Sequence, residues 1–459
     1  MTALRLLSAS GELSDAALND AGGYARPSGP LRSRVAYAAA HVVPVAWGDN
    51  TPGQPADIDW DATLAFRRHV YSWGLGVADA MDTAQRNMGL DAAATRELIA
   101  RSAEVAREEG GSVVVGVGTD HVDEPHLSLD AVIDAYKEQL HFTEEQGAGP
   151  VLMASRHLAR AATDAADYRR VYRAVLSSAT VPVVLHWLGA AFDPELEGYF
   201  GSTDWRTAAG VLLDIIAENP GKVAGVKMSL LDAESEISVR SRLPEDVRMF
   251  TGDDFHYVGL IGGDSLGGGR FDSPSARSTS GESSSPRSLS DGGASSPRSL
   301  SDERSSSPRS LSDERSEESK RALAEESSDS PPAPPASARN HSDALLGAFA
   351  AIAPVASAAI QALDAGDPDA YLRLLGPTEE LSRQVFAAPT FHYKAGVAFL
   401  AWLNGHQPAF QMVAGLHSAR SLPHLSRIVE LANASQALEH PELALQRWHG
   451  LLRLNGVDA

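Results

Sequence analysis

Short apolar runs alternate with longer amphipathic stretches along most of the chain before residue 265. Between the runs, stretches such as 91–109 and 129–146 place apolar residues at helical spacing and charges on the other face. Alternating βα units are typical of a parallel sheet covered by helices. Eight runs have the length and apolar content of buried strands: 35–43, 75–81, 112–117, 150–154, 181–187, 223–228, 247–251 and 344–350, although the last also fits the start of a helix.

The number of these units predicts how the sheet closes. Seven or eight βα units of this total length indicate an α/β fold of the TIM type, a (β/α)₈ barrel. From residue 353 onward helix follows helix, for example at 367–386 and 422–438. We therefore predict a C-terminal helical extension after the barrel.

A Ser-rich segment, 265–341, interrupts the pattern just before the eighth strand. It has few large apolar side chains and repeats the octamer SSPRSLSD, beginning at Ser284, Ser295 and Ser306. Such a composition cannot bury enough apolar surface to offset its ordering entropy, so we predict a long disordered insert. The predicted organisation is an N-terminal segment (1–33), barrel strands one to seven (34–264), the insert (265–341), and the last barrel unit with the helical extension (342–459).

Composition excludes several function classes. The chain has 459 residues and no cysteine, which excludes disulfides, Cys-ligated metals and a thiol nucleophile. Its formal net charge of −21 argues against nucleic acid as a partner. No run of 18 apolar residues occurs, so we expect no membrane association and predict a soluble, cytoplasmic protein. No dinucleotide, P-loop or serine-hydrolase motif is present, and we predict no cofactor.

Ionisable residues stand at nearly every predicted strand end, where a TIM barrel carries its active site. Any one of them could be a hydrogen-bonded core residue or a solvated loop residue. Because so many of them converge at the strand ends, we interpret them as members of an active site. The residues are His41, Asp82, Asp120, His121, His157, His186, Lys227, Asp253 and Asp254.

Lys227 is the most informative of these residues. It lies in the apolar run VAGVKM, where strand alternation points its side chain into the barrel. Burial disfavours the charged form and lowers the pKa of a lysine, as a Schiff-base nucleophile requires. The alternative is a buried structural ion pair with a carboxylate such as Asp254.

The surroundings of Lys227 resemble a known family. Gly225-Val226-Lys227, followed by Thr251-Gly252-Asp253-Asp254, resembles the dihydrodipicolinate synthase and N-acetylneuraminate lyase superfamily, which are Schiff-base class I aldolases on a TIM barrel. The chain looks most like an uncharacterised dihydrodipicolinate-synthase-like branch. Supporting stretches, in matching order, are 80–85, 115–118, 147–152, 181–185, 186–189 and 192–194.

The resemblance implies a lyase or aldolase that forms a Schiff base with a 2-keto acid or related carbonyl compound. The residues implied in catalysis are Lys227, His157 and His186 for proton transfer, and Asp254 to orient the lysine. The residues implied in substrate binding are Thr83, Asp82, Arg156, Gln85 and His41.

Two departures from the family limit this reading. The family's second-strand Gly-Thr-Thr-Gly-Glu reads Met81-Asp82-Thr83-Ala84-Gln85 here, so that Thr83 is the one direct match. The family tyrosine after the fourth strand is missing, because the chain reads Ala154-Ser155-Arg156-His157. The pocket is therefore expected to take a substrate other than pyruvate plus aspartate semialdehyde.

Two alternatives stay open. His41, Asp120, His121, His186 and Asp254 are residue types that bind Zn²⁺ or Mn²⁺, which would make the protein a metal-dependent hydrolase or isomerase. The second alternative is a barrel that has lost catalysis and serves as a scaffold. In the helical tail, the stretch 391–394 (Phe-His-Tyr-Lys) indicates packing on the barrel flank or a subunit contact in a homo-oligomer.

Overall fold

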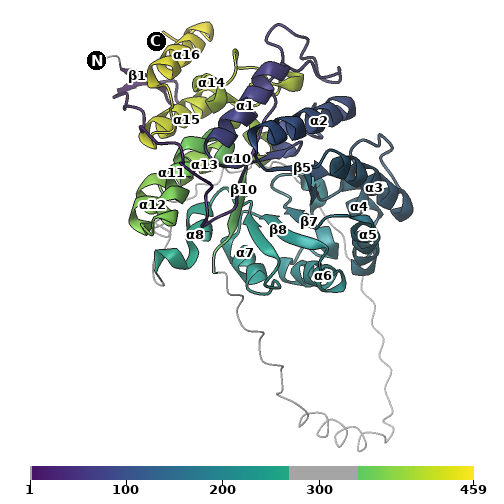
Figure 1. Cartoon of the computed structure of the whole chain (residues 1–459). Helices are drawn as coiled ribbons and strands as arrows, with labels where there is room; N and C mark the ends of the chain where they lie inside the picture. Colours follow the sequence, from purple (N-terminus) through teal and green to yellow (C-terminus); the bar gives the residue numbers. More distant parts are fainter. Residues whose placement is uncertain (1–2, 268–339, 459) are drawn as a thin grey trace, which may run out of the picture. The chain divides into compact units, whose positions relative to one another are not determined.

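The computed structural model describes residues 3–267 and 340–458. At its centre eight parallel strands close into a barrel, which confirms the predicted (β/α)₈ fold (Figure 1). Their order is β10-β3-β4-β5-β6-β7-β8-β9. The strands are β3 (Ala36–Ala39), β4 (Gly76–Asp79), β5 (Val113–Val117), β6 (Gly149–Leu152), β7 (Val183–Leu188), β8 (Val223–Ser229), β9 (Arg248–Thr251) and β10 (Asp343–Leu346).

An apolar layer fills the barrel interior. It is formed by Ala39, Ala78, Val114, Val151, Val184, Phe250 and Leu345 with Met81 and Met153. Gly225 makes room for this layer, because a Cβ there would lie 2.7 Å from the ring of Phe250. Polar groups are therefore expected beyond the layer, toward the strand ends.

Helices cover the outside of the barrel, where the outward strand residues pack against them. The predicted helices at 91–109 and 129–146 are α2 and α3, and α2 begins at the Asp91 cap and ends at Gly110. The barrel helices are α1 (Trp60–Ser72), α2 (Ala92–Glu109), α3 (Leu129–Glu145), α4 (Arg156–Ala161), α5 (Ala165–Ser178), α6 (Trp205–Glu218), α7 (Ala233–Arg240) and α8 (Tyr257–Gly262).

The eighth unit contains both structures that the run 344–350 allowed. The strand β10 ends at Leu346, and α10 (Gly347–Ala351) follows at once. Just before β10, the Ser342 N–H donates to the carbonyl of Leu260 at 2.8 Å, which joins the two described parts of the chain. The predicted disordered insert falls almost entirely on residues 268–339, which lie outside the described residues.

The predicted C-terminal helical extension is present. Its helices are α11 (Ala353–Asp364), α12 (Pro368–Leu375), α13 (Thr378–Val385), α14 (Tyr393–Leu403), α15 (Leu422–Ala434) and α16 (Pro441–Leu454). The single helix predicted at 367–386 is wrong in its continuity, because the chain breaks it at Gly376-Pro377. Pro377 has no N–H for the helical ladder.

The N-terminal segment forms a hairpin that the hydrophobic pattern did not predict. Strand β1 (Leu4–Leu7) pairs antiparallel with β2 (Leu13–Ala16) and packs on the last helices, so that the two ends of the chain lie together (Figure 1). The Leu7 N–H donates to Ser426 Oγ at 2.8 Å, and Trp448 Nε1–H donates to the carbonyl of Arg5 at 2.6 Å.

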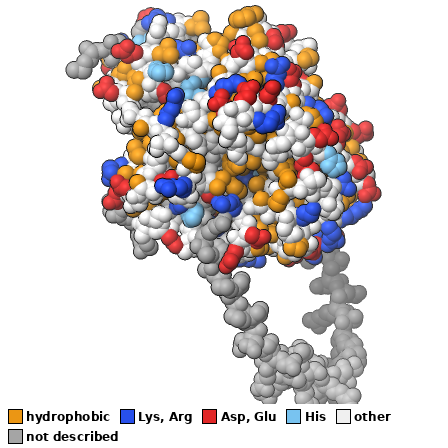
Figure 2. Space-filling view, viewed as in Figure 1, with side chains coloured by type: hydrophobic (Ala, Val, Ile, Leu, Met, Phe, Trp, Pro, Cys, Tyr) orange, Lys and Arg blue, Asp and Glu red, His pale blue; other side chains and the backbone are white. Residues whose placement is uncertain are grey.

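Acidic and basic side chains are interspersed on the face that Figure 2 shows, despite the overall acidic composition. Exposed ion pairs such as Arg427–Glu380 join the two kinds of charge among the described residues. Among the described residues, no helix combines the length and the apolar character that a bilayer crossing needs.

A buried carboxyl on α7 gives the fold a testable pH dependence. Burial raises the pKa of Glu236 to about 7, although the Ser342 hydroxyl donates to it at 2.6 Å and Arg240 lies nearby. The unfolded chain loses this proton near pH ~4.3. From there to about pH 7 the folded state binds a proton that the unfolded state lacks, so the free energy of unfolding falls as pH rises, by on the order of 3 kcal/mol.

We expect Glu236→Gln to remove this dependence. In urea titrations at pH 5 and pH 8, the stability of the variant relative to the wild type should increase with pH, because glutamine does not titrate. An equal difference at both pH values would contradict the assignment.

Candidate active site

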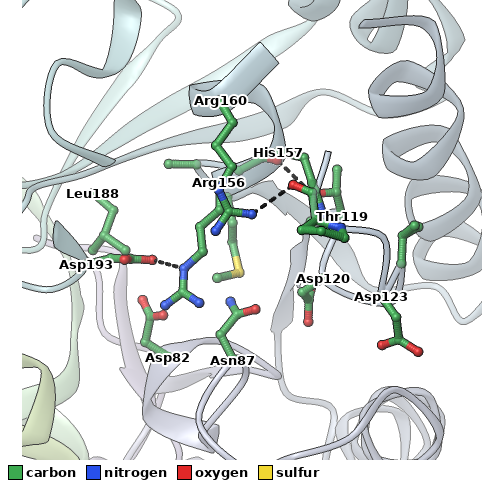
Figure 3. A pocket seen from close by; sticks show the side chains of 16 residues that line it. Asp82, Asn87, Thr119, Asp120, Asp123, Arg156, His157, Arg160, Leu188 and Asp193 are labelled. Atoms are coloured by element: carbon green, nitrogen blue, oxygen red, sulfur yellow. Dashed lines mark hydrogen bonds and ion pairs between the residues drawn. The ribbon is translucent and has the colours of Figure 1, made fainter. Parts of the chain in front are cut away.

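The strand ends bring several predicted residues to one cavity of about 190 Å³ (Figure 3). They come from four successive βα connections, because the strand ends of a closed barrel converge at one face. Asp82 follows β4, Thr119 follows β5, Arg156 and His157 begin α4 after β6, and Asp193 follows β7.

Arg156 reaches into this cavity toward two carboxylates (Figure 3). Its Nε donates to Asp193 Oδ2 at 2.7 Å, and Asp82 lies near the end of the guanidinium. Burial alone would lower the pKa of the guanidinium, but the hydrogen bond and charge of Asp193 raise it, with help from Asp82. The terminal Nη atoms make no hydrogen bond to any described residue, so this edge is open to an anionic group.

His157 has both ring nitrogens occupied. Its Nε2 lies 2.9 Å from the carbonyl of Glu124, which only accepts, so Nε2 carries the proton. Its Nδ1 lies 2.8 Å from the hydroxyl of Thr119. Burial lowers the pKa of His157. The ring therefore anchors the loop after β5, and its predicted role in proton transfer would require one of these bonds to break.

Lys227 lies on β8, directly beside His186 of β7 in the strand register. It is 8% exposed, and within residues 3–267 and 340–458 its amine has neither a hydrogen bond nor an ion pair within 4 Å. Burial lowers the pKa of Lys227, while the charges of Asp82 and Asp254 act to raise it. Lys227 does not line the cavity itself. Asp82 connects the two, because it lines the cavity and its charge also acts on Lys227.

Asp254 does not form the buried ion pair that was the alternative reading of Lys227. Its carboxyl accepts the Ala348 N–H at 3.0 Å, and burial raises the pKa of Asp254 to about 8, against the effects of that hydrogen bond and of the Lys227 charge. No direct contact places Asp254 as the group that orients the lysine, so this role stays a prediction.

Gly252 leaves room for the lysine. A Cβ at Gly252 would lie 2.2 Å from Ser229 Oγ, 2.7 Å from the carbonyl of Met228 and 3.0 Å from Lys227 Cε. Because one of these neighbours is backbone, the space cannot open by a side-chain rotation alone. The glycine of the Thr251-Gly252-Asp253-Asp254 stretch is thus required by the close packing of β8 against the end of β9.

His186 keeps one free nitrogen. Its Nε2 lies 3.2 Å from Ser229 Oγ, and its buried Nδ1 has no hydrogen-bond partner among the described residues. Burial, and secondly the charge of Lys227, lower the pKa of His186 well below its ordinary value. A neutral imidazole beside the lysine can accept or donate a proton.

The extension supplies two residues that sequence reasoning assigned to flank packing or a subunit contact. The Tyr393 hydroxyl lies 2.8 Å from Thr83 Oγ1, and both side chains are buried. Lys394 is 2% exposed, and burial lowers its pKa to about 8 although Asp82 and Asp193 act to raise it. The available signal was a lysine beside a tyrosine at the start of an otherwise apolar helix.

Three predicted substrate-binding residues do not line the cavity: Thr83, which bonds to Tyr393, and His41 and Gln85. His41 Nε2 lies 3.0 Å from Gln407 Oε1, and burial lowers the pKa of His41 to about 3. Gln85 donates through Nε2 to the carbonyl of Val413 at 2.9 Å. Both side chains connect the barrel to the extension, so their assignment to substrate binding has no support from this geometry.

The five residues that were the alternative metal ligands, His41, Asp120, His121, His186 and Asp254, do not form a metal site. Asp120 is bound by Arg86, whose charge holds the pKa of Asp120 below its usual value despite burial, and His121 Nδ1 lies 2.7 Å from Gln139 Nε2. In the described part of the chain, these five residues do not bring three ligand atoms together.

A family model described as "Protein of unknown function (DUF993)" matches residues 4–271 and 336–457. The chain belongs to the DUF993 family. The search of curated proteins found no match to this DUF993 protein.

Solved dihydrodipicolinate synthases share its fold. The enzyme from Aquifex aeolicus has a TM-score of 0.53 and 11% identity, covering 88% of this chain and 99% of its own. The Oceanobacillus iheyensis enzyme has a TM-score of 0.52 and 11% identity, with 88% and 96% covered. The Thermotoga maritima enzyme has a TM-score of 0.52 and 12% identity, with 89% and 100% covered. The likeness confirms the predicted resemblance at the level of the fold.

Proposed function

We propose that this protein is a class I aldolase or lyase that forms a Schiff base between Lys227 and a small 2-keto acid or related carbonyl compound. The observation that carries the proposal is the buried amine of Lys227 at the strand ends, without an ion-pair partner among the described residues. An amine with a lowered pKa is neutral in a larger fraction of molecules near pH 7 and is therefore nucleophilic. The barrel shared with dihydrodipicolinate synthases supports the same reading.

In this mechanism the Nζ lone pair of Lys227 attacks the substrate carbonyl carbon. Proton transfer gives a carbinolamine, which loses water to form a protonated imine. In cleavage, the protonated imine accepts the electron pair of the breaking C–C bond and becomes an enamine that is still bound to Lys227. In the forming direction, the imine loses a proton from the neighbouring carbon, and the resulting enamine attacks the second carbonyl compound. Hydrolysis of the imine returns the free lysine.

Arg156 is the proposed anchor for the substrate carboxylate. Its Nε is held by Asp193 at 2.7 Å, which fixes the guanidinium plane, and the Nη edge faces the cavity (Figure 3). A planar carboxylate pairs well with such an edge. Asp82, which also lines the cavity, would repel a second carboxylate, which favours a substrate whose far end is neutral or cationic.

Two groups are candidates for proton transfer. His186 offers its free Nδ1 next to Lys227. The Thr83–Tyr393 pair offers a hydroxyl relay. Burial is the main cause that raises the pKa of Tyr393, and the nearby charges of Asp82 and Asp254 raise it further. Tyr393 would thus supply from α14 the hydroxyl that is missing after β6.

Borohydride trapping tests the proposal directly. The protein is incubated with pyruvate or one of a panel of 2-keto acids, reduced, and analysed by intact mass spectrometry and peptide mapping. A stable adduct on the peptide containing Lys227 is expected for at least one acid. Labelling that is absent for the whole panel, or that maps only to other lysines, would contradict the proposal.

The relay gives a separate prediction. With the acid that labels the protein, Tyr393→Phe is expected to keep the trapped adduct but to slow deuterium exchange at the carbon next to the imine by about 10²-fold, because proton transfer loses its hydroxyl. Exchange is followed by NMR. Tyr371→Phe is the matched control, since that buried hydroxyl donates to the carbonyl of Val258 outside the cavity. Equal exchange in both variants would exclude Tyr393 from the relay.

A further inference from the structure

Three ligand-type side chains meet at a point away from the barrel mouth. His69 is in the last turn of α1, His406 follows α14, and Glu439 precedes α16. His406 Nε2 lies 2.7 Å from Glu439 Oε1, and His69 Nε2 lies 3.4 Å from the same oxygen. All three ligand atoms lie within 4.8 Å of one another. Barrel and extension are therefore joined here by two imidazoles and one carboxylate.

This arrangement has the size and chemistry of a metal site. Zinc binds imidazole nitrogens and carboxylate oxygens at about 2.0–2.2 Å, which puts tetrahedral ligand atoms roughly 3.3–3.6 Å apart. The 3.4 Å separation between His69 Nε2 and Glu439 Oε1 lies in that range, and the 2.7 Å separation between His406 Nε2 and the same oxygen is shorter, so a small outward rotation of the side chains would receive an ion. Two histidines and one glutamate leave a fourth position for water.

The surroundings hold the ligands in place. The ring of Phe66 lies 6.0 Å from that of His69 and 5.4 Å from that of His406, and forms an apolar wall. Asn404 accepts the backbone N–H of Glu439 at 2.9 Å and donates to the carbonyl of Ala437 at 3.0 Å, which fixes the loop before α16. Such supporting contacts orient metal ligands.

The cluster is also accessible. The side chains of His69, His406 and Glu439 are 15%, 16% and 19% exposed, so an ion and its water can enter from solvent.

We propose that His69, His406 and Glu439 form a binding site for a divalent transition metal ion, with Zn²⁺ as the best fit, and that the bound ion fastens the extension to helix α1. The site is separate from the cavity lined by Arg156 and from the chemistry proposed for Lys227. Its role is structural: it keeps the segment that carries Tyr393 against the barrel. The competing account is a metal-free triad in which both Nε2–H groups donate to the glutamate.

The test uses the full chain after dialysis against a chelator. Zinc chloride is titrated by calorimetry, and zinc is counted by elemental analysis after gel filtration. We expect one tightly bound zinc per chain in the wild type and its loss in His406→Asn and in Glu439→Gln. His417→Asn is the matched control, because this half-buried histidine of the same extension lies outside the cluster; it should bind as the wild type does.

A second readout does not depend on how well the variants fold. Zinc should raise the melting temperature of the wild type and of His417→Asn by a few degrees, and should leave His406→Asn unchanged. Cobalt(II) in place of zinc should give the visible absorption of a four-coordinate site. No zinc uptake by the wild type, or equal uptake by all variants, would overturn the proposal in favour of the metal-free triad or of a site elsewhere. Borohydride trapping at Lys227 is measured in parallel, so failure of one proposal is distinguishable from failure of the other.

Discussion

Lys227→Ala is expected to abolish the borohydride-trapped adduct and to reduce turnover by several orders of magnitude. The reason is chemical, because in the proposed mechanism the imine that accepts the electron pair forms on Lys227. The packing consequence should be small, because the Lys227 amine bonds to no described residue. The measurement is intact mass after reduction, together with circular dichroism to verify that the variant folds.

Lys394→Met provides the matched control for this prediction. Lys394 is the second buried lysine near Asp82, and its pKa of about 8 makes it a competing nucleophile. We expect the methionine variant to keep the adduct at Lys227, since methionine fills a similar volume in the first turn of α14. An adduct that survives Lys227→Ala and disappears in Lys394→Met would move the Schiff base to the extension and refute the assignment to β8.

Asp79→Ala is expected to lower the free energy of unfolding by about 3–5 kcal/mol, since it leaves the buried Arg67 charge without its partner. The two side chains are fully buried, and Arg67 donates to both carboxylate oxygens of Asp79, at 3.0 and 2.8 Å. The same guanidinium donates to the carbonyls of His41 and Thr63, which ties α1 to the ends of β3 and β4. Urea denaturation measures the loss.

The matched control is an ion pair at the surface. Arg427 and Glu380 also pair, but their side chains are 41% and 65% exposed. We expect Glu380→Ala to cost less than about 1 kcal/mol, because solvent screens the pair. Equal losses for Glu380→Ala and Asp79→Ala would show that burial does not govern the strength of the Arg67–Asp79 pair.

Much of the fold was predictable because it depends on local patterns. The apolar runs, the helical stretches between them and their number are properties of short segments, and the closed barrel follows from their order. The break at Gly376-Pro377 could have been read from the proline alone. The hairpin at β1 and β2 could not, since its stability comes from α15 and α16 at the other end of the chain.

The residues of the candidate site also separate into those that local sequence patterns predicted and those that they did not. Lysine in an apolar strand is visible in the sequence, because period-2 alternation decides which way its side chain points, and Arg156 follows from its place after a strand. His41 was predicted as a substrate-binding residue from its position on the first strand, and Gln85 from the family resemblance of the stretch 81–85. Their partners, Gln407 and Val413, come from the extension, and no local pattern reveals such a pairing.

The sequence by itself therefore determined the barrel, the C-terminal helices and the inward lysine on β8, all of which follow from the spacing of apolar residues. Only the tertiary structure decided that Tyr393 meets Thr83 across 310 residues of sequence, and that Lys394 faces Asp82. It also decided that His69, His406 and Glu439 come together. The physical reason is that these contacts depend on how the extension docks on the barrel, which is set by packing over the whole interface rather than by any segment.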